Sequence, residues 1–513
     1  MDRVDSLPSP LPGDDVAEAA DVYASAPLLN CLLRELAEPV TEHVHRLRGS
    51  GRLLRVSGTR RPTRPEVRTG GVWHRLSHSE LVKVTAEELR GFTGVSSPEL
   101  PAEMIDSRDA VAALLTARAR AVPPSDPYLR SEQSLITGHP HHPAPKARGG
   151  GPAAGWLPYA PEAHARFPLV LLAVREDAVA EEGDTTALDR LGEAPAGYRL
   201  LPAHPWQLDL VGGRPEVRDA FADGRLLRLP APGPLAHPTA AVRTVHLPDT
   251  LPDDLFLKFS LDVRITNDVR RLWRHDLLKL RRADAAAASA FAASPSAAWL
   301  SDRGYRTADF AFEELAVLVR DGLRPHVRPG AVPLLTAALV EGFDGSPLDR
   351  LTDPAAWWTA YVRQVVPPAL AAFARHGVVL EAHLQNTLVA VDADGTPVQA
   401  LFRDAEGVKL LSDVTRAAGW ERLVYCLIVN HLSELAALLT ERHPDTDPWP
   451  TVRTELTRCA TLHGGIPEIP ALLNAPTLPG KTNLLLRWTA ANGADARYLP
   501  LPNPLRAGTD ARR

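Results

Sequence analysis

Residues 381–407, EAHLQNTLVAVDADGTPVQALFRDAEG, carry the clearest structural signal in this chain. Two apolar or alternating runs, TLVAV and TPVQALF, flank the turn residues DADG at 392–395. Such runs on either side of an Asp-Gly turn predict a β-hairpin. Asn386 and Asp404 are equidistant from Gly395 in the sequence. We therefore expect their side chains to meet at the open end of the hairpin.

An amide oxygen and a carboxylate side by side are suitable ligands for Mg²⁺ beside a nucleoside triphosphate. Phosphotransferases of the kinase type place an Asn before one strand and an Asp after the next in this way. The catalytic aspartate of those enzymes is missing here, because Leu384 and Gln385 fill the stretch between His383 and Asn386. The segment predicts a Mg-ATP site without the kinase base. An incidental surface hairpin is the alternative.

A second group of polar residues lies upstream, in AAVRT (240–244), LFLKFSLDV (255–263) and ITNDVR (265–270). Lys258 stands in an apolar strand, where a lysine is unexpected unless it faces a cleft. We expect a helix over 265–282 with Thr266 or Asn267 as its N-cap, whose free amides favour anions. Arg270 would oppose that helix dipole, a cost that a bound anion would offset. The alternative is a solvated helix charge.

The third group is the loop GHPHHPAPKAR at 138–148. Its prolines stiffen a backbone that displays His139, His142, Lys146 and Arg148 within a short span. Arg forms forked hydrogen bonds to oxyanions and Lys supplies a point charge, so the loop suits polyanion binding. A zinc site is one alternative, although neither a nearby Cys nor an HExxH pattern supports it. A solvated basic loop is the other.

Composition limits the class of protein. The chain has 513 residues, 45% hydrophobic and 23% charged, which is typical of globular proteins of about three domains. A net charge of -5 gives no reason to expect nucleic acid or an acidic membrane as a partner. The N-terminus has no apolar segment typical of a signal peptide, and the apolar run 423–439 contains Asn430 and His431. We expect a buried helix there and a soluble, cytoplasmic protein.

Lysine is rare in this chain, so each lysine merits attention. Of 57 basic residues most are arginine, a bias typical of a GC-rich genome. Lys481 follows LPG in an otherwise apolar context and is a candidate site residue. The three cysteines are widely spaced and show no CxxC pattern, which argues against a disulfide framework.

The pattern of apolar residues predicts mixed helices and strands in three parts, with an α+β fold. We place the parts at 1–130, mainly helical, 131–345, mixed α/β, and 346–513, which holds the hairpin. The longer elements expected are a small sheet at 52–86, strands at 167–174, 197–202, 239–247 and 255–263, and helices at 309–342, 355–376, 413–441 and 448–463.

Taken in order, these segments resemble the IucA/IucC family of siderophore synthetases, which act independently of nonribosomal peptide synthetases. The matching motifs are GHPxHPxxKxRxG (138–150), HPWQ (204–207), RT at 243 with the Lys258 strand, ITxxxR (265–270), ExHxQN (381–386), RDxxG (403–407) and a late lysine, Lys481. The resemblance spans about 130 to 505. One departure is Ala241, where the family commonly has Ser, a hydroxyl donor to the nucleotide.

The resemblance implies a cupped-hand fold of thumb, fingers and a kinase-like ATP-binding palm. It implies Mg-ATP-dependent adenylation of a carboxylic acid, citrate or a citryl or succinyl derivative. An amine or hydroxyl then captures the acyl-adenylate, and AMP and pyrophosphate leave. The residues implied by their motif positions are His139, His142, Arg270 and His383 for catalysis, Lys146, Arg148, Arg243, Lys258, Thr266, Asn267, Glu381 and Gln385 for ATP, Asn386 and Asp404 for Mg²⁺, and Arg270, His383 and Lys481 for the substrate.

Two other functions compete with this interpretation. A small-molecule kinase would use the same hairpin but would release ADP rather than AMP. A metal-binding protein would use the histidine cluster without ATP turnover. The sequence leaves open which acid and which nucleophile are used, while the family resemblance favours a homodimer and small-molecule partners.

Overall fold

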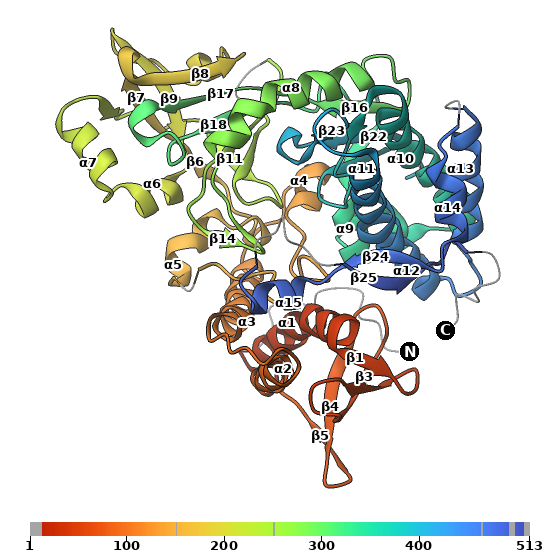
Figure 1. Ribbon diagram of the computed structural model, residues 1–513. Coiled ribbons are helices and arrows are strands. Elements are labelled where there is room, and N and C mark those ends of the chain that lie inside the picture. The colour runs from red at the N-terminus through yellow and green to blue at the C-terminus, as the bar shows by residue number, and fades with distance from the viewer. Residues whose placement is uncertain (1–12, 150, 250–251, 463–464, 492–497, 507–513) are drawn as a thin grey trace.

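The computed structural model describes residues 13–149, 151–249, 252–462, 465–491 and 498–506. The chain forms a mixed helix and strand structure, with its N-terminal part below, its central part to the upper left and its C-terminal part to the right in Figure 1. The described chain contains several sheets, of which the largest has seven strands and lies in the central part.

The N-terminal part packs three helices against a small sheet. The helices are α1 (Gly13–Leu36), α2 (His78–Thr93) and α3 (Glu99–Arg118). The sheet is antiparallel, in the order β1 (Ala37–Pro39), β2 (Val44–Leu47), β3 (Leu53–Ser57), β4 (Thr63–Thr69) and β5 (Val72–Arg75). The predicted sheet over 52–86 is confirmed for β3 to β5. The rest of that range was predicted wrongly, because a capping box at Ser77 starts helix α2 at His78.

The central part contains the seven-stranded sheet and a smaller one. The large sheet has the order β6 (Phe167–Pro168), β11 (Leu235–Pro238), β12 (Thr244–Leu247), β13 (Leu255–Phe259), β18 (Val317–Asp321), β17 (Asp302–Ala308) and β8 (Val179–Gly183). The smaller sheet has the order β10 (Leu226–Arg228), β7 (Val170–Arg175) and β9 (Tyr198–Ala203), beside α6 (Pro205–Val211) and α7 (Pro215–Ala222). All of the predicted strands in this part are present, although several are shorter.

The C-terminal part is built on the predicted hairpin. Its sheet has the order β16 (Ala297–Leu300), β22 (Pro397–Arg403), β21 (Thr387–Val391) and β19 (Val332–Leu335). Helices α8 (Arg274–Phe291) and α10 (Pro354–His376) cover it, and α13 (Trp449–Leu462) packs against α10. Because β16 and β19 precede residue 346, one hydrophobic core spans the predicted boundary at 345.

Smaller elements complete the described chain. Helical ones are α4 (Pro127–Glu132), α5 (Ala153–Trp156), α9 (Thr336–Glu341), α11 (Arg416–Leu423), the π-helical segment η8 (Val424–Leu432), α12 (Ser433–Arg442), α14 (Glu468–Asn474) and α15 (Asn483–Trp488). Strand pairs are β14 (Arg264–Ile265) with β15 (Asp268–Val269), β20 (Val378–Val379) with β23 (Lys409–Leu410), and β24 (Thr477–Lys481) with β25 (Tyr498–Pro502).

Two helix predictions were wrong. Thr266 and Asn267 form the turn between β14 and β15, and helix α8 begins only at Arg274. The backbone there continues a ladder in which the Arg270 N–H donates to the Val263 carbonyl at 3.0 Å. The helix expected over 309–342 is instead largely β18, β19 and the short α9. Strand β18 lies inside the central sheet between β13 and β17, where β-branched residues pack well.

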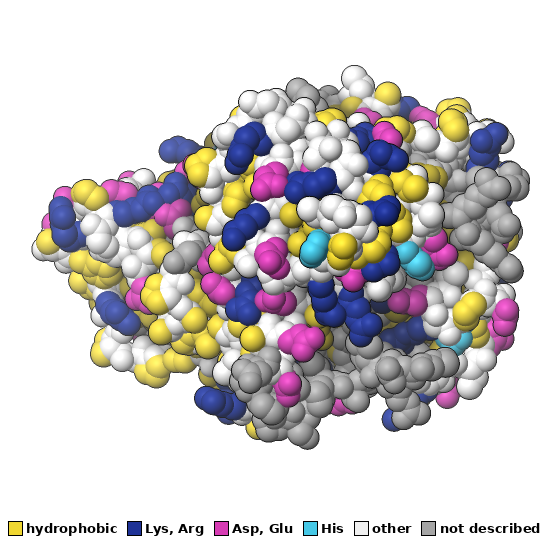
Figure 2. Space-filling view, turned by 90° about the horizontal axis from the view of Figure 1, so that it is seen from below, with side chains coloured by type: hydrophobic (Ala, Val, Ile, Leu, Met, Phe, Trp, Pro, Cys, Tyr) yellow, Lys and Arg dark blue, Asp and Glu magenta, His cyan; other side chains and the backbone are white. Residues whose placement is uncertain are grey.

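The most apolar helical run is a core element. Arg416–Arg442 is the one described run long and apolar enough to cross a membrane by length and composition alone. However, 78% of its most apolar window is buried inside the protein. Figure 2 shows the face seen from below, where Lys and Arg side chains lie interspersed with Asp and Glu. Thus this face carries no field of a single sign.

The core around α10 provides a test of the packing. Leu370 is 1% exposed, and truncating such a leucine removes buried area and leaves a cavity. We expect Leu370→Ala to lower the free energy of unfolding by about 2–5 kcal/mol, measured by urea unfolding followed by tryptophan fluorescence. Leu278→Ala is the matched control, because Leu278 is 58% exposed on α8. Equal shifts in the two variants would contradict this account of the core.

Candidate functional site

The hairpin brings Asn386 and Asp404 to one small hollow, as the sequence predicted. A β-bulge between Ala390 and Val391 shifts the register by one residue. As a result Asn386 lies opposite Arg403, whose N–H donates to the Asn386 carbonyl at 3.1 Å. Asp404 follows in the left-handed region, with φ of 85°. A residue other than glycine rarely adopts this conformation, which turns the chain away from the strand.

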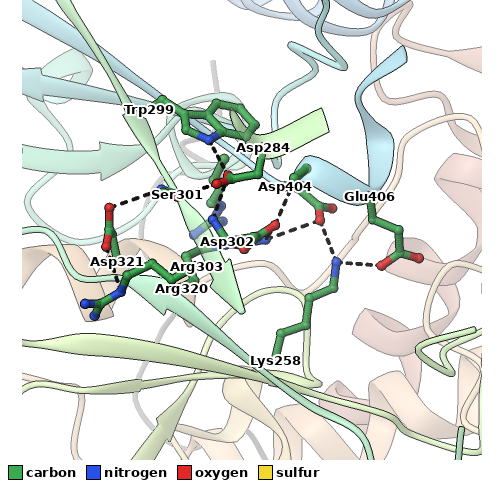
Figure 3. A network of polar contacts seen from close by, with 12 residues as sticks. Lys258, Asp284, Trp299, Ser301, Asp302, Arg303, Arg320, Asp321, Asp404 and Glu406 are labelled. Carbon is green, nitrogen blue, oxygen red and sulfur yellow. Dashed lines mark hydrogen bonds and ion pairs between the residues drawn. The ribbon is translucent and has the colours of Figure 1, made fainter. Parts of the chain in front are cut away.

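Two buried cations hold the Asp404 carboxylate. The Lys258 Nζ lies 2.5 Å from Asp404 Oδ1, and an Arg320 Nη2 lies 3.2 Å from the same oxygen. Figure 3 shows both cations converging on this carboxylate. Burial alone would raise the pKa of Asp404, but the charges of Lys258 and Arg320 outweigh it and hold the pKa below its usual value. Asp404 is therefore held as an ionised carboxylate.

Glu406 extends the same network. Lys258 Nζ lies 2.8 Å from a Glu406 oxygen, and the Arg243 guanidinium lies 3.1 Å from it. Arg243 also donates to the carbonyls of Arg270 and Arg271, each at 3.0 Å. The unexpected lysine in the apolar strand β13 is thus 3% exposed and paired. Without such pairs, burying a lysine would cost several kcal/mol.

A polar cavity of about 250 Å³ lies beside this network. Five separate segments build it: the histidine loop, the β14–β15 turn, the start of the 381–407 segment, the α11–η8 helix and the C-terminal hairpin with α15. The lining residues are His139, His142, Thr266, Asn267, Glu381, His383, Arg422, Tyr425, Cys426, Asn430, Lys481, Asn483 and Tyr498.

Burial keeps the three histidines of this cavity neutral. It lowers the pKa of His139 to about 3 and that of His383 to about 4, and it lowers the pKa of His142 well below its usual value. The charged lining residues are Glu381, Arg422 and Lys481, and Glu381 forms an ion pair with Arg422. The cavity therefore keeps an excess of positive charge, with Lys481 as its source.

Arg270 is a half-buried cation that contacts Thr266, a residue of the cavity lining. Its guanidinium donates to the Thr266 hydroxyl at 2.6 Å and to the Ile265 carbonyl at 2.7 Å. Within the described ranges no carboxylate forms an ion pair with it. Burial lowers the pKa of Arg270, as expected of a cation without a counter-ion. Because no helix begins at Thr266, the prediction that Arg270 opposes a helix dipole is wrong. The guanidinium of Arg270 still suits an anion, since no carboxylate of the described residues pairs with it.

Lys146 and Arg148 do not line the cavity. Both pair with Glu162, at 2.5 Å and 2.8 Å, and all three side chains are buried. The two cations overcome the effect of burial and lower the pKa of Glu162 to about 2. Glu162 carries one negative charge and balances only one of the two cations, so a net positive charge remains beside it. The phosphate-binding role predicted for Lys146 and Arg148 stays a prediction.

Gln385 also lies outside the lining, and its carboxamide donates to the Ala240 carbonyl at 3.2 Å. It thus joins the hairpin to the loop that carries Arg243.

Some residues of the cavity lining were not predicted from the sequence, namely Arg422, Tyr425, Cys426, Asn430, Asn483 and Tyr498. The one usable signal was Asn430, a polar residue in the apolar run that forms η8. A π-helix is often found at functional sites, and this one places Tyr425, Cys426 and Asn430 on the cavity wall.

The histidine loop does not form a metal site of its own. No group of three or more His, Cys, Asp or Glu side chains within the described ranges is placed to hold a metal ion. His141 instead approaches Glu434 at 2.8 Å and Arg34 at 2.7 Å. The alternative of a histidine-cluster metal protein therefore has no support from the geometry.

Within the described residues, a polar cavity with an excess of positive charge lies beside buried cations and carboxylate oxygens. This arrangement is typical of proteins that bind polyanions and acids. Comparison with known proteins makes the assignment specific. The model of the IucA / IucC family matches residues 127–341, and that of the ferric iron reductase FhuF-like transporter matches residues 355–496. The central part of the chain is therefore similar to the IucA / IucC family.

Curated relatives and a solved structure agree with this. The L-2,3-diaminopropanoate–citrate ligase of Staphylococcus aureus is 29% identical over 441 residues, 74% of this chain and 75% of the relative. The rhizobactin siderophore biosynthesis protein RhbC of Rhizobium meliloti is 28% identical over 447 residues, with the same coverage. ATP-bound aerobactin synthetase IucA from Klebsiella pneumoniae has a TM-score of 0.78 at 22% identity, covering 95% of this chain and 100% of that one.

The neutral histidines predict how stability depends on pH. The pKa of His383 is about 4 in the folded protein and about 6.5 in an unfolded chain. The unfolded chain therefore binds the proton first, so this contribution is fully present above about pH 6.5 and is lost as the pH falls toward 4. We expect the free energy of unfolding of His383→Gln to fall less between pH 7 and pH 5 than that of the wild type. The difference should be up to about 1.4 kcal/mol per pH unit, measured by urea unfolding. Parallel curves for the two proteins would contradict the buried neutral state.

Proposed function

We propose that this chain is an ATP-dependent ligase of siderophore biosynthesis that joins a carboxyl group of citrate, or of a citryl or succinyl derivative, to an amine or hydroxyl. The observation that carries the proposal is the cation-rich network at Asp404 lying beside an acid-binding cavity. The chain is 29% identical to a citrate ligase, which supports citrate as the proposed acid substrate. Activation proceeds through an acyl-adenylate, with release of AMP and pyrophosphate.

The nucleotide end of the site consists of Arg243, Lys258, Arg270, Asn386 and Asp404. Attack of a carboxylate on the α-phosphorus brings two anions together, so the cations must offset their repulsion and the charge on the leaving pyrophosphate. Asn386 and the ionised Asp404 supply oxygen atoms, the donor type that Mg²⁺ prefers, and would hold the ion. When bound, Mg²⁺ neutralises charge on the triphosphate.

The acid end of the site consists of the cavity. Lys481 and Arg422 supply positive charge for the carboxylates of the substrate. The imidazoles of His139, His142 and His383 are neutral, and a bound anion raises their pKa, which suits them to donate hydrogen bonds to the acid. Thr266, Asn267 and Glu381 border both ends. No enzyme nucleophile is required, because the acyl-adenylate itself is the activated species.

The wider properties follow from this assignment. We propose that the three parts correspond to thumb, fingers and palm, with the hairpin in the palm, and that the protein acts in the cytoplasm, where ATP is available. Two copies associate as a homodimer. Its substrates are small molecules, and neither nucleic acid nor membrane is a partner. Lys146 and Arg148 do not line the cavity, and Gln385 has a positioning role.

The test is product analysis with ATP and Mg²⁺ over a panel of citrate, 2-oxoglutarate and succinyl-hydroxycadaverine, with hydroxylamine as surrogate nucleophile. We expect citrate-dependent pyrophosphate and AMP together with a hydroxamate product. Formation of ADP would instead identify a kinase, and a lack of turnover with every acid would overturn the proposal.

Arg270 provides the matched mutational test. We expect Arg270→Ala to reduce pyrophosphate release at least 100-fold, because Arg270 forms no ion pair within the described ranges and its charge is free to stabilise the transition state. Arg271→Ala is the control, since Arg271 is the neighbouring arginine and its charge is already paired with Asp262. Equal losses in both variants would show that Arg270 acts only through folding.

Asp404 provides a separate test of the metal assignment. Asp404→Asn keeps an oxygen but removes the charge, so we expect the Mg²⁺ concentration for half-maximal rate to rise at least 10-fold. Asp413→Asn, which alters an exposed carboxylate paired with Arg282, should leave it unchanged. An unchanged Mg²⁺ requirement in Asp404→Asn would remove Asp404 from the metal site.

A further inference from the structure

The N-terminal part contributes no residue to the cavity lining within the described ranges, yet it holds one wall of the cavity in place. The contact is made by Glu35, in the last turn of α1. Its two carboxylate oxygens accept the backbone N–H groups of Leu484 and Leu485 at 2.9 Å and 2.8 Å. These donors belong to the first turn of α15, where backbone N–H groups lack partners within the helix.

Helix α15 is a C-terminal element docked into the N-terminal part. Leu484 and Trp488 are buried in a core whose other buried members all lie between residues 28 and 147. The Trp488 indole donates to the Val95 carbonyl at 3.1 Å, and Arg487 forms an ion pair with Glu103 on α3. Figure 1 shows α15 beside α1, α2 and α3, far from the C-terminal sheet.

The residues just before this docked turn line the cavity. Lys481 ends β24 and Asn483 begins α15. The Asn483 carboxamide is 3% exposed, donates to the His141 carbonyl at 2.7 Å and accepts from Asn267 at 3.3 Å. Asn483 thus joins the histidine loop and the β14–β15 turn, and its position depends on the turn that Glu35 holds.

Helix α1 holds the other side of the same wall. The Asn30 carboxamide donates to the Pro140 carbonyl at 3.1 Å, and Arg34 approaches His141 at 2.7 Å. Asn30 and Arg34 are four residues apart, so they lie on the same face of α1. One helix of the N-terminal part therefore grips both the histidine loop and the segment that carries Lys481 and Asn483.

We infer that Glu35 is a positioning residue for substrate recognition, which sets the affinity for the carboxylic acid by holding Asn483 and Lys481 at the cavity wall. The inference rests on the proposed function for the identity of that acid. The inference predicts different effects of Glu35 on the affinities for the two substrates, ATP and the carboxylic acid. The nucleotide end depends on Lys258 and Asp404, which Glu35 does not contact, whereas the acid end depends on the turn that Glu35 holds.

The kinetic test compares Glu35→Ala with Glu103→Ala in the full chain. Glu103→Ala is the matched control, because it removes a carboxylate that holds the opposite end of α15. At pH 8 we expect Glu35→Ala to raise the KM for citrate at least 10-fold and to leave the KM for ATP within twofold. Glu103→Ala should change both by less than twofold, and Glu35→Gln, which keeps one acceptor oxygen, should lie between wild type and Glu35→Ala. An unchanged KM for citrate, or an equal rise in both KM values, would overturn the inference.

A second readout does not depend on turnover. Amide hydrogen exchange is measured in the full chain and followed in a proteolytic peptide spanning 477–488. The amides of Leu484 and Leu485 should exchange faster in Glu35→Ala than in wild type, and at the wild-type rate in Glu103→Ala. Unchanged exchange in Glu35→Ala would overturn the inference even if citrate is not the substrate. If the wild type turns over no acid, the proposed function fails separately, and this exchange result still decides the role of Glu35.

Discussion

The relative placement of the central sheet and the hairpin depends on a buried network of charged side chains. Lys258 and Arg320 lie on neighbouring strands of the central sheet, and both reach Asp404 at the end of the hairpin. Burying such ions costs several kcal/mol each, and removing one partner leaves the other unpaired. The central sheet and the hairpin are therefore restricted to one relative position. That position also brings Asn386 to Asp404 and sets both beside the cavity.

Part of the backbone strain lies around the same charges. Val242, Thr266 and Asp404 are three of the six described non-glycine residues with positive φ, at 64°, 60° and 85°. Such residues persist only where their surroundings impose the conformation. Val242 directly precedes Arg243, Thr266 lines the cavity, and Asp404 anchors the network. At these three positions the strained backbone lies beside the charge network and the cavity.

The cavity joins parts of the chain that are remote in sequence. The histidine loop, the central turn and the hairpin start supply one side, and the π-helical segment and Lys481 supply the other. The C-terminal helix α15 then returns to the N-terminal core through Glu35. Because each wall is held by a different part of the chain, the acid site is complete only when all three parts are folded together.

Local sequence was sufficient for features that depend on neighbours in the chain. The alternating runs around the Asp-Gly turn located the hairpin, the apolar periodicity located α10 and α13, and one misplaced lysine located the charge network. The β-bulge, which moved Asn386 opposite Arg403, was not predictable, because it depends on how the strands pack.

Partners that are distant in sequence decided the rest. Lys146 and Arg148 lie in a loop with the composition of a phosphate-binding site, but both pair with Glu162, which balances one of the two charges. Arg422 carries no local signal, yet it pairs with Glu381 in the cavity. The sequence alone was enough to establish which residue types the chemistry requires and the strands that carry them. Which charges stay unpaired and can bind a substrate is a property of the tertiary structure, since the energy of a buried charge depends on partners that only folding brings within a few ångströms.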